Sequence, residues 1–353
     1  MSFRSFALSA LALSAAAAAQ AQSSYNLYGV IDLSLGSMQL SGLSTSADNK
    51  RTTKVEPNAM TTSFIGLKGL EDLGGGMKAG FVLESFLRPD TGAQGRFDND
   101  RFWGRAANVF LDSGYGKLTI GRQGNLLFGQ VASFNPFGGA FGLSPAVRLT
   151  FGRWGNDRGD SGWANAVTYN TPKFGGASFA VSWQPGEDPD KGERSSYAVS
   201  GSYVAGPFAV GGAWQTLGAA EPPKGDFLEG QRQTFGLLSS SYDFGVAKLF
   251  AQYGKISNSG FSTTARIDTK LYQLGASVPL SSAGKLLVSY GQSSEKPVEG
   301  GTTPKTKHTI VSVGYDHLLS KRTDVYAVVM HDKEKLANFR SGTSYVLGLR
   351  HAF

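Results

Sequence analysis

Apolar and polar residues alternate along most of the chain after Tyr25, and apolar residues at helical spacing are rare. The segment 27–35 sorts alternate residues onto an apolar face and a polar face. The apolar face carries Leu27, Ile31, Leu33 and Leu35. The same sorting recurs in segments 177–184, 272–278 and 345–353. A period of two indicates β-strands, and one apolar face per strand is typical of a sheet with an apolar environment on one side only.

Short and long connections alternate between these strands. The short turns lie at 71–76, 113–116, 171–176, 205–207, 243–245, 280–284 and 318–323. The long polar loops lie near 38–62, 87–104, 123–164, 185–194, 216–230, 254–267, 292–306 and 332–341. Seven turns and eight loops make 15 connections, so the pattern predicts 16 antiparallel strands. An even number of strands with short turns on one side and long loops on the other is typical of a transmembrane barrel.

Strands that cross lipid must form one closed sheet, because an open edge would leave backbone N–H and C=O groups without partners. We therefore expect an all-β fold, a 16-stranded antiparallel transmembrane β-barrel with long external loops, in a single domain. A barrel of this size is wide enough to hold water, whereas an eight-stranded barrel is filled by its own side chains.

The first 21 residues have the form of a secretory signal peptide. Arg4 precedes an apolar run over 6–19, and small residues follow at Ala19 and Ala21. That run of about 14 residues is shorter than the roughly 20 that a transmembrane helix needs. We expect residues 1–21 to be removed on export, which leaves 22–353 as the barrel and lowers the net charge from +7 to +6 through the loss of Arg4.

Composition excludes several other classes of protein. The 47 glycines and 12% aromatic residues suit many short strands joined by tight turns. A mean hydropathy of −0.17 argues against a helical membrane protein but suits a barrel, in which only alternate residues face lipid. The absence of cysteine excludes thiol catalysis. A basic chain would suit nucleic acid in the cytoplasm, but export separates this chain from that partner.

The longest loop, 123–164, is expected to narrow the lumen. A loop of this length is uncommon unless it is functional or disordered. Its glycines and phenylalanines suit packing against a wall. Its charged residues include Arg148, Arg153 and Arg158 against Asp157 and Asp160. We expect this third loop to fold inward as a constriction with a positive bias; the alternative is an ordinary external loop with scattered charge.

Five segments, in order along the chain, carry a sequence resemblance. They are Leu27-Tyr-Gly-Val-Ile-Asp32, Gly66-Leu-Lys-Gly-Leu-Glu-Asp-Leu-Gly-Gly-Gly-Met-Lys78, Gly116-Lys-Leu-Thr-Ile-Gly-Arg-Gln123, Tyr315-Asp-His-Leu-Leu-Ser-Lys-Arg-Thr323 and Gly348-Leu-Arg-His-Ala-Phe353. These segments resemble the Gram-negative general porins of the β-proteobacterial type, and the resemblance covers all of 22–353. It implies a 16-stranded homotrimer whose third loop folds into the pore opposite basic residues of the wall.

The resemblance assigns the wall residues one at a time. Arg105 and Arg122 match wall arginines, and Lys68 matches a lysine of the second strand. Two positions depart from the family pattern, because Phe64 stands where a pore-facing arginine is usual and Asn170 occupies the corresponding position of the sixth strand. With the charges of the third loop, these residues make up the expected lining of the constriction.

We therefore expect a channel in the outer membrane of a Gram-negative bacterium that passes small hydrophilic solutes and ions by diffusion. A positive lining concentrates anions, so we predict a mild anion preference. The alternative is a substrate-selective channel for aromatic or dicarboxylate anions on the same scaffold. A barrel enzyme is a third class, but no serine, histidine and acid can be assembled into a catalytic set. We expect no cofactor and no metal site; 98–100 lacks the rest of a calcium loop.

The last strand carries a second functional pattern. Tyr345, Leu347, Leu349 and Phe353 share one face and resemble the signal that outer-membrane barrel assembly machinery reads. The same residues are also what a lipid-facing final strand requires. Further aromatics near strand ends are expected to form interfacial girdles. They are Tyr25, Phe179, Trp183, Phe208, Trp214, Tyr253, Tyr272 and Tyr290. Outer-membrane lipid and lipopolysaccharide are the expected surroundings.

Overall fold

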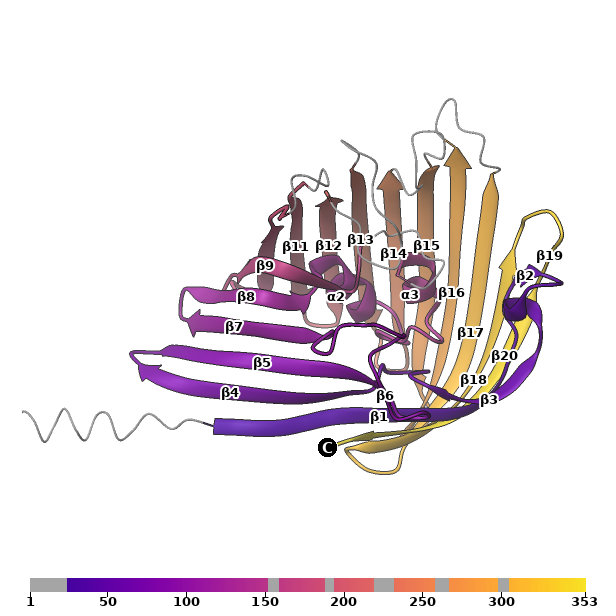
Figure 1. Cartoon of the computed structure of the whole chain (residues 1–353), viewed down its shortest axis with the longest axis horizontal. Helices are drawn as coiled ribbons and strands as arrows, with labels where there is room; N and C mark the ends of the chain where they lie inside the picture. The colour runs from indigo at the N-terminus through magenta and orange to yellow at the C-terminus, as the bar shows by residue number, and fades with distance from the viewer. Residues whose placement is uncertain (1–23, 152–158, 188–193, 219–231, 258–266, 298–304) are drawn as a thin grey trace, which may run out of the picture.

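The computed structural model describes residues 24–151, 159–187, 194–218, 232–257, 267–297 and 305–353. Within these ranges, 16 strands form a closed antiparallel barrel (Figure 1). They are β1 (Ser24–Met38), β4 (Phe64–Gly74), β5 (Met77–Arg88), β7 (Ala106–Ser113), β8 (Gly116–Gly124), β9 (Gly162–Asn170), β10 (Ala177–Gln184), β11 (Ser196–Ala205), β12 (Phe208–Leu217), β13 (Gln233–Asp243), β14 (Lys248–Ser257), β15 (Ile267–Pro279), β16 (Gly284–Pro297), β17 (Thr306–Leu318), β18 (Thr323–Glu334) and β20 (Gly342–Ala352). The predicted fold class is confirmed.

Shorter elements lie in or beside the loops. They are β2 (Gly42–Leu43), η1 (Ala47–Asn49), β3 (Thr52–Pro57), β6 (Ala93–Gln94), α2 (Leu126–Ser133), α3 (Pro145–Thr150) and β19 (Phe339–Arg340). No helix in the described ranges is long and apolar enough to cross a membrane. The expected signal peptide lies outside the described residues.

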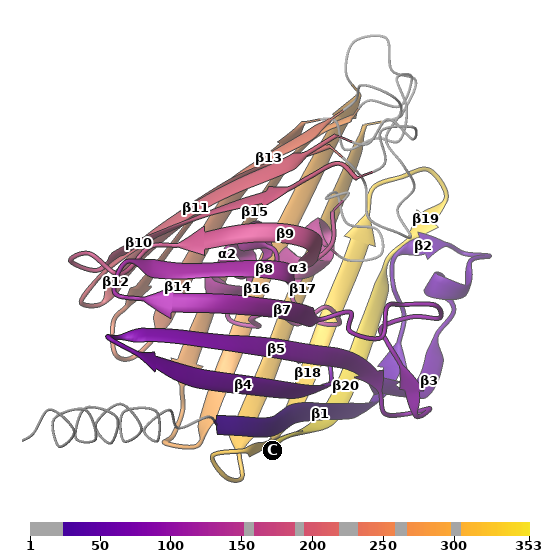
Figure 2. The ribbon, with the colours of Figure 1, turned by 60° about the vertical axis from the view of Figure 1, so that its left-hand side comes forward.

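The barrel closes between its first and last strands. β20 pairs with β1 in antiparallel register, with Leu33 opposite Leu349. The backbones of Gly29 and Phe353 exchange two hydrogen bonds, of 3.2 and 3.1 Å. The C-terminus therefore lies beside β1 in both views of the ribbon (Figures 1 and 2). The terminal residues complete the backbone hydrogen bonding that a lipid-embedded sheet requires.

The expected alternation of faces is present around the wall. On β1, Leu27 and Leu35 are exposed on the outside while Asp32 and Ser34 are buried on the inside. Most of the aromatics expected in the girdles are exposed to the outside. They are Tyr25, Phe179, Trp183, Phe208, Trp214 and Tyr253. Because only alternate residues contact lipid, the inner positions are free to be polar.

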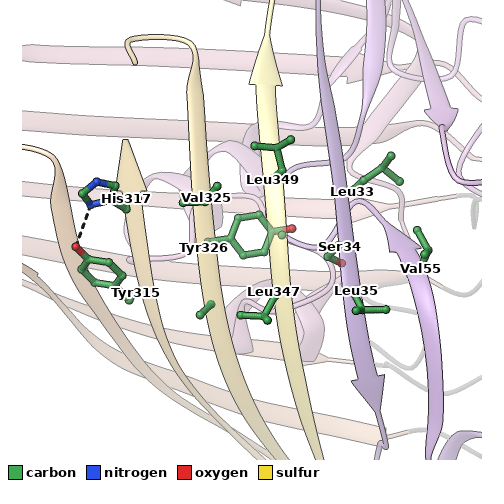
Figure 3. A pocket seen from close by; sticks show the side chains of 12 residues that line it. Leu33, Ser34, Leu35, Val55, Tyr315, His317, Val325, Tyr326, Leu347 and Leu349 are labelled. Carbon is green, nitrogen blue, oxygen red and sulfur yellow. Dashed lines mark hydrogen bonds between the residues drawn. The ribbon is translucent and has the colours of Figure 1, made fainter. Parts of the chain in front are cut away.

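The outer wall is hollowed around the closure seam (Figure 3). The hollow has a volume of about 830 Å³ and crosses β17, β18, β20, β1 and β3. Leu33, Leu347 and Leu349 border it, and the Tyr315 hydroxyl hydrogen bonds to His317 at its side. Leu347, Leu349, Tyr345 and Phe353, the residues of the C-terminal pattern, are all exposed on this outer face.

Several loops are shorter than the sequence pattern suggested. β14 continues to Ser257, β16 to Pro297 and β18 to Glu334, and the third loop spans 125–161 and not 123–164. Strand pairing persists beyond the apolar band into segments that are polar on both faces. A prediction from polarity alone therefore ends these strands too early.

The chain segment that pairs with β1 as the second strand of the barrel is interrupted between β3 and β4. β1 pairs with β3 at Leu33 opposite Pro57 and with β4 at Val30 opposite Phe64, so residues 58–63 leave the ladder. The buried carboxylate of Asp32 accepts the backbone N–H groups of Met60, at 2.8 Å, and Thr61. It also accepts the hydroxyl of Tyr326 across the seam. Asp32 thus replaces the ladder bonds that the interruption removes.

Candidate functional site

The third loop folds into the barrel, as expected. Figures 1 and 2 show α2 and α3 inside the ring of strands. Asn125 caps α2, because its side chain accepts the backbone N–H of Leu127 at 2.8 Å. Ser144 caps α3 in the same way, and Pro145 fits the first helical turn, where no N–H partner is needed. Two local capping signals therefore form the two short helices of the loop.

Apolar packing holds the loop against one side of the wall. Leu127 and Val131 of α2 are buried against Phe235 and Leu237 of β13. Leu143 and Leu149 are buried with Ile310 in a second cluster. Burial of apolar side chains contributes roughly 1.5–3 kcal/mol each. The third loop therefore packs against the inner face of β12–β18.

Glycines on the inner face of the wall make room for this packing. A Cβ at Gly275 would lie 2.6 Å from Pro136, and one at Gly291 would lie 2.8 Å from the Pro145 side chain. Hydrogen bonds complete the attachment. The Gln252 side chain donates to the carbonyl of Phe134 at 2.8 Å, and the Ser312 hydroxyl donates to Leu143 at 2.7 Å.

Arg105 directly precedes β7 and lies beside Glu84 of β5. Its Nε lies 3.0 Å from a carboxylate oxygen of Glu84, and its guanidinium lies 4.2 Å from the centroid of the Phe64 ring. The Tyr28 hydroxyl donates to the other oxygen of Glu84 at 2.6 Å. The Nζ of Lys68 lies 4.8 Å from the Tyr28 ring. Three expected lining residues, Lys68, Arg105 and Phe64, are therefore neighbours on one patch of wall.

Arg122 and Asp160 belong to a buried ion network that ties the second loop to the third. Arg122 donates to Asp160 at 2.6 Å, and Arg96 of the second loop donates to both oxygens of Asp160 at 2.6 and 3.0 Å. Arg96 also pairs with Asp100 at 2.8 Å. We call Arg96, Asp100, Arg122 and Asp160 the loop latch.

The latch fixes the charge of Asp160. Burial alone would raise the pKa of this carboxyl, but the positive charges and hydrogen bonds of Arg96 and Arg122 outweigh burial and lower the pKa to about 2. Arg122 itself is only 6% exposed. These two residues therefore anchor the end of the third loop and present little charge to the passage.

Arg148 lies at the other end of the loop, near the wall. Its guanidinium lies 3.6 Å from Asp332, whose carboxylate also bonds to His308 at 2.6 Å. Arg148 borders a pocket of about 170 Å³ between the first and third loops, together with Lys54 and Glu56. The remaining expected residues, Arg153, Asp157 and Arg158, lie outside the described residues.

In several ion pairs of the barrel the basic partner is more exposed than the acidic partner, whereas the pairs of Arg122 with Asp160 and Arg88 with Asp98 have the reverse order. The Lys285 side chain is 47% exposed and that of its partner Asp316 only 2%. Arg105 is 39% exposed and Glu84 12%. The pairs of Arg148 with Asp332, Arg350 with Asp324 and Lys54 with Glu56 have the same order. In these pairs the ammonium or guanidinium group is therefore more exposed to solvent than the carboxylate.

Acidic and basic residues alternate at the turn ends of β4, β5, β7 and β8. Asp72 lies opposite Lys78, Lys78 opposite Asp112, and Asp112 opposite Lys117 across four neighbouring strands. Alternating charges at directly opposed positions stabilise a sheet and cancel one another at a distance. These four strand ends therefore add little net charge to the turn side of the barrel.

Sequence reasoning missed the partners of the expected basic residues. Glu84, Arg96 and Asp332 were absent from the expected set, although they fix Arg105, Asp160 and Arg148. No local motif marks them, since each lies on a different strand or loop from its partner. Their signal is the register across strands, which requires the folded barrel.

A closed 16-stranded barrel with an inward loop and a charged aqueous passage defines a channel protein of the bacterial outer membrane. Residues 7–337 match the family model described as "Gram-negative porin". The chain belongs to that family and is a protein of the Gram-negative outer membrane.

Individual relatives agree with the family. The chain is 31% identical to outer membrane porin protein 32 of Delftia acidovorans, over 97% of both chains. It is 28% identical to an outer membrane porin protein of Bordetella pertussis, over 96% of both. Among solved structures it is similar to the anion-selective porin from Comamonas acidovorans, with a TM-score of 0.76 and 25% identity over 94% of this chain and 100% of that one. OmpF of Salmonella typhi shares the fold at a TM-score of 0.67 and 16% identity, over 93% and 97%.

Proposed function

We propose that this porin passes small hydrophilic solutes by diffusion with a mild preference for anions. The observation that carries the preference is the order of exposure in the pairs of Arg105 with Glu84, Arg148 with Asp332, Lys285 with Asp316 and Arg350 with Asp324, in which the basic side chain is the more exposed. The solved structure of 25% identity is named as anion-selective, which supports the same preference here. The chain acts as a channel and not as an enzyme.

The mechanism is electrostatic filtering. A low-dielectric wall focuses the field of charges that line a narrow aqueous passage, and the focused field concentrates counter-ions. Lys68, Arg105 and Arg148 are the proposed charged lining. Arg122 and Asp160 hold the third loop in position, and Phe64 supports the guanidinium of Arg105 from behind.

Planar bilayer recording tests this proposal. Purified protein is incorporated under a gradient of potassium chloride, and the reversal potential gives the ratio of chloride to potassium permeability. We expect stepwise ohmic openings and a ratio above one. A ratio clearly below one would show that the exposed basic groups do not control permeation.

A second candidate is selective uptake of organic anions that carry an aromatic ring. The arrangement that favours it is Arg105, which lies over the ring of Phe64 with Phe86 at 5.9 Å, so that a carboxylate-binding cation is set in an aromatic surface. Benzoate added at millimolar concentration distinguishes the candidates. Saturable block of single-channel current favours selective uptake, whereas a current that is unchanged apart from conductivity favours simple diffusion.

We propose that the mature chain begins at Gln22 and assembles as a homotrimer. The cleavage pattern at 19–21 and the family resemblance support these points. Intact mass measurement of the purified protein tests the first. A high-mass band in mild detergent that converts to monomer on heating tests the second, and a monomer without heating would contradict it.

We further propose two partners. The exposed apolar alternation at Tyr345, Leu347, Leu349 and Phe353 supports recognition by barrel assembly machinery. Deletion of Phe353 in cells should lower the amount of folded porin, whereas deletion of an exposed turn residue should not. The second partner is lipopolysaccharide, which forms the outer leaflet around an outer-membrane barrel.

A further inference from the structure

The first and third loops enclose a small cavity against the inner face of the wall. Its volume is about 170 Å³. The start of the first loop, β3 and the segment that leads into α3 border it, and Ser34 of β1 and Val346 of β20 lie on its wall side. We call this cavity the loop niche. Its apolar and basic lining residues include Leu40, Lys54, Ala59, Leu143, Arg148 and Val346.

Contacts within and between the two loops hold the lining of the niche in place. A Cβ on Gly142 of the third loop would lie 2.9 Å from the carbonyl oxygen of Ala59 in the first loop, so the two backbones touch at the edge of the niche. Across the first loop, the backbone N–H of Leu40 donates to the carbonyl of Asp48 at 2.8 Å. The niche is therefore a preformed cavity, and a preformed cavity can select a ligand by size.

One part of the lining is apolar. Ala59, Leu143 and Val346 belong to the buried cluster that also contains Leu149 of α3, and Leu40 packs against this cluster. An aliphatic group placed in the niche would cover this surface and remove it from water, which favours binding. The apolar part of the lining therefore suits a hydrocarbon chain.

Arg148 supplies the niche with a cation whose donors are only partly used. Its Nη1 donates to the carbonyl of Gly142 at 3.1 Å. Its Nη2 lies 3.6 Å from the carboxylate of Asp332, which is longer than a hydrogen bond, and that carboxylate also bonds to His308 at 2.6 Å. The Nε–H of Arg148 has no acceptor in the part of the chain that the structure describes. A guanidinium presents its donors as a planar fork that matches a carboxylate, so a carboxylate is the group that Arg148 fits.

The charged residues that border the niche leave a surplus of positive charge. They are Lys50, Lys54 and Arg148 against Asp48 and Glu56. Lys54 and Glu56 form a pair at 2.6 Å, in which the lysine side chain is 46% exposed and the glutamate side chain 30%. One negative charge would balance this lining, whereas a cation would increase the surplus. The charge of the niche therefore favours a monoanion.

The volume of the niche limits the ligand to a small molecule. A water molecule takes up about 30 Å³ in the liquid, so a cavity of about 170 Å³ holds roughly five or six groups of that size. Butyrate has about that size, whereas benzoate is larger.

We propose that the loop niche binds a short-chain aliphatic monocarboxylate, with its carboxylate on Arg148 and its alkyl chain on Leu40 and Val346. The proposal goes beyond diffusion with anion preference, because diffusion requires no binding site. It is also separate from the arrangement of Arg105 and Phe64, which favours an aromatic ring.

The first test measures binding of butyrate to the folded, full mature chain in detergent by saturation-transfer NMR. Acetate, hexanoate and butylamine are titrated in the same way. We expect butyrate to saturate at millimolar concentration and to bind about tenfold more tightly than acetate, which has no chain to cover the apolar lining, or hexanoate, which exceeds the cavity. Butylamine should not bind, and added benzoate should not displace butyrate.

The second test compares three variants. Arg148→Gln removes the guanidinium and should weaken butyrate binding about tenfold. Arg340→Gln, at an exposed arginine of β19 that does not border the niche, is the matched control and should change binding less than about twofold. Leu40→Ala enlarges the niche and should shift the preference from butyrate to hexanoate, which tests the site even if Arg148→Gln does not fold.

Three results would overturn the proposed site. They are the absence of saturation by butyrate, equal binding by the Arg148 and Arg340 variants, and an unchanged chain-length preference in Leu40→Ala. Displacement of butyrate by benzoate would also overturn it, because the ligand would then share a site with aromatic anions. The NMR titration does not measure ion permeation, so a failure of this site is distinguishable from a failure of anion preference in the bilayer.

Discussion

The guanidinium of Arg105 lies 4.2 Å from the ring centroid of Phe64, a residue that is itself only 7% exposed. The ring covers one face of the cation, and Glu84 lies beside it at 3.0 Å. The Arg105 side chain is nevertheless 39% exposed. Phe64 stands where the family usually has an arginine, and its buried ring positions the exposed charge of Arg105. This part of the wall therefore stays basic although its usual arginine is absent.

Removal of that charge should weaken anion preference. A unit charge about 6 Å from an ion in water contributes about 0.7 kcal/mol, so Arg105→Gln is expected to lower the chloride to potassium permeability ratio about two- to threefold. Glu84→Gln is the matched control and should raise the ratio. Reversal potentials in a potassium chloride gradient give both values, and a shift of the same sign in the two variants would contradict the proposal.

Loss of the shared carboxylate of the loop latch should destabilise the protein. Asp160→Asn leaves the buried guanidinium groups of Arg96 and Arg122 without a full counter-charge, which costs about 3 kcal/mol or more. Asp98→Asn removes the exposed partner of Arg88 and should cost less than about 1 kcal/mol. Denaturant unfolding of the folded barrel measures both. Similar losses in the two variants would mean that the network does not anchor the loop.

The latch should also respond to acid in a defined range. The pKa of Asp160 is lowered to about 2 in the folded state, so its contribution is complete above the unfolded value of about 3.9. The contribution is lost as pH falls through about 2. The difference in unfolding midpoint between wild type and Asp160→Asn should therefore be constant from pH 7 to about 5 and shrink below about pH 4. A difference that disappears already at pH 6 would assign the effect to another group.

A methyl group on the wall behind α3 should displace the third loop. The Cβ of Gly291→Ala would lie 2.8 Å from the Pro145 side chain, and such overpacking costs roughly 1–3 kcal/mol. We expect a lower single-channel conductance because α3 moves toward the passage. Gly236→Ala is the control, since its Cβ would meet only a Trp214 ring atom at 3.9 Å. Unchanged conductance in the Gly291 variant would show that the loop does not set the width of the passage.

Much of this molecule is determined by local sequence. Alternation along segments such as 27–35 and 345–353 gives the strands and their lipid faces, and the alternation of short and long connections gives their number. The capping residues Asn125 and Ser144 form the helices of the third loop from local hydrogen bonds. These features depend on neighbours within a few positions of one another, so a linear pattern is sufficient to find them.

Only the tertiary structure decided which charges meet. By sequence, Arg122 matches a wall residue of the passage. In the structure Arg122 is buried in the loop latch, because the fold brings Arg96 of the second loop and Asp160 of the third loop together beside it. Lys285 and Asp316 meet because the register of β16 and β17 places them directly opposite each other. Register is fixed by closure of the whole barrel, and a local pattern does not contain it.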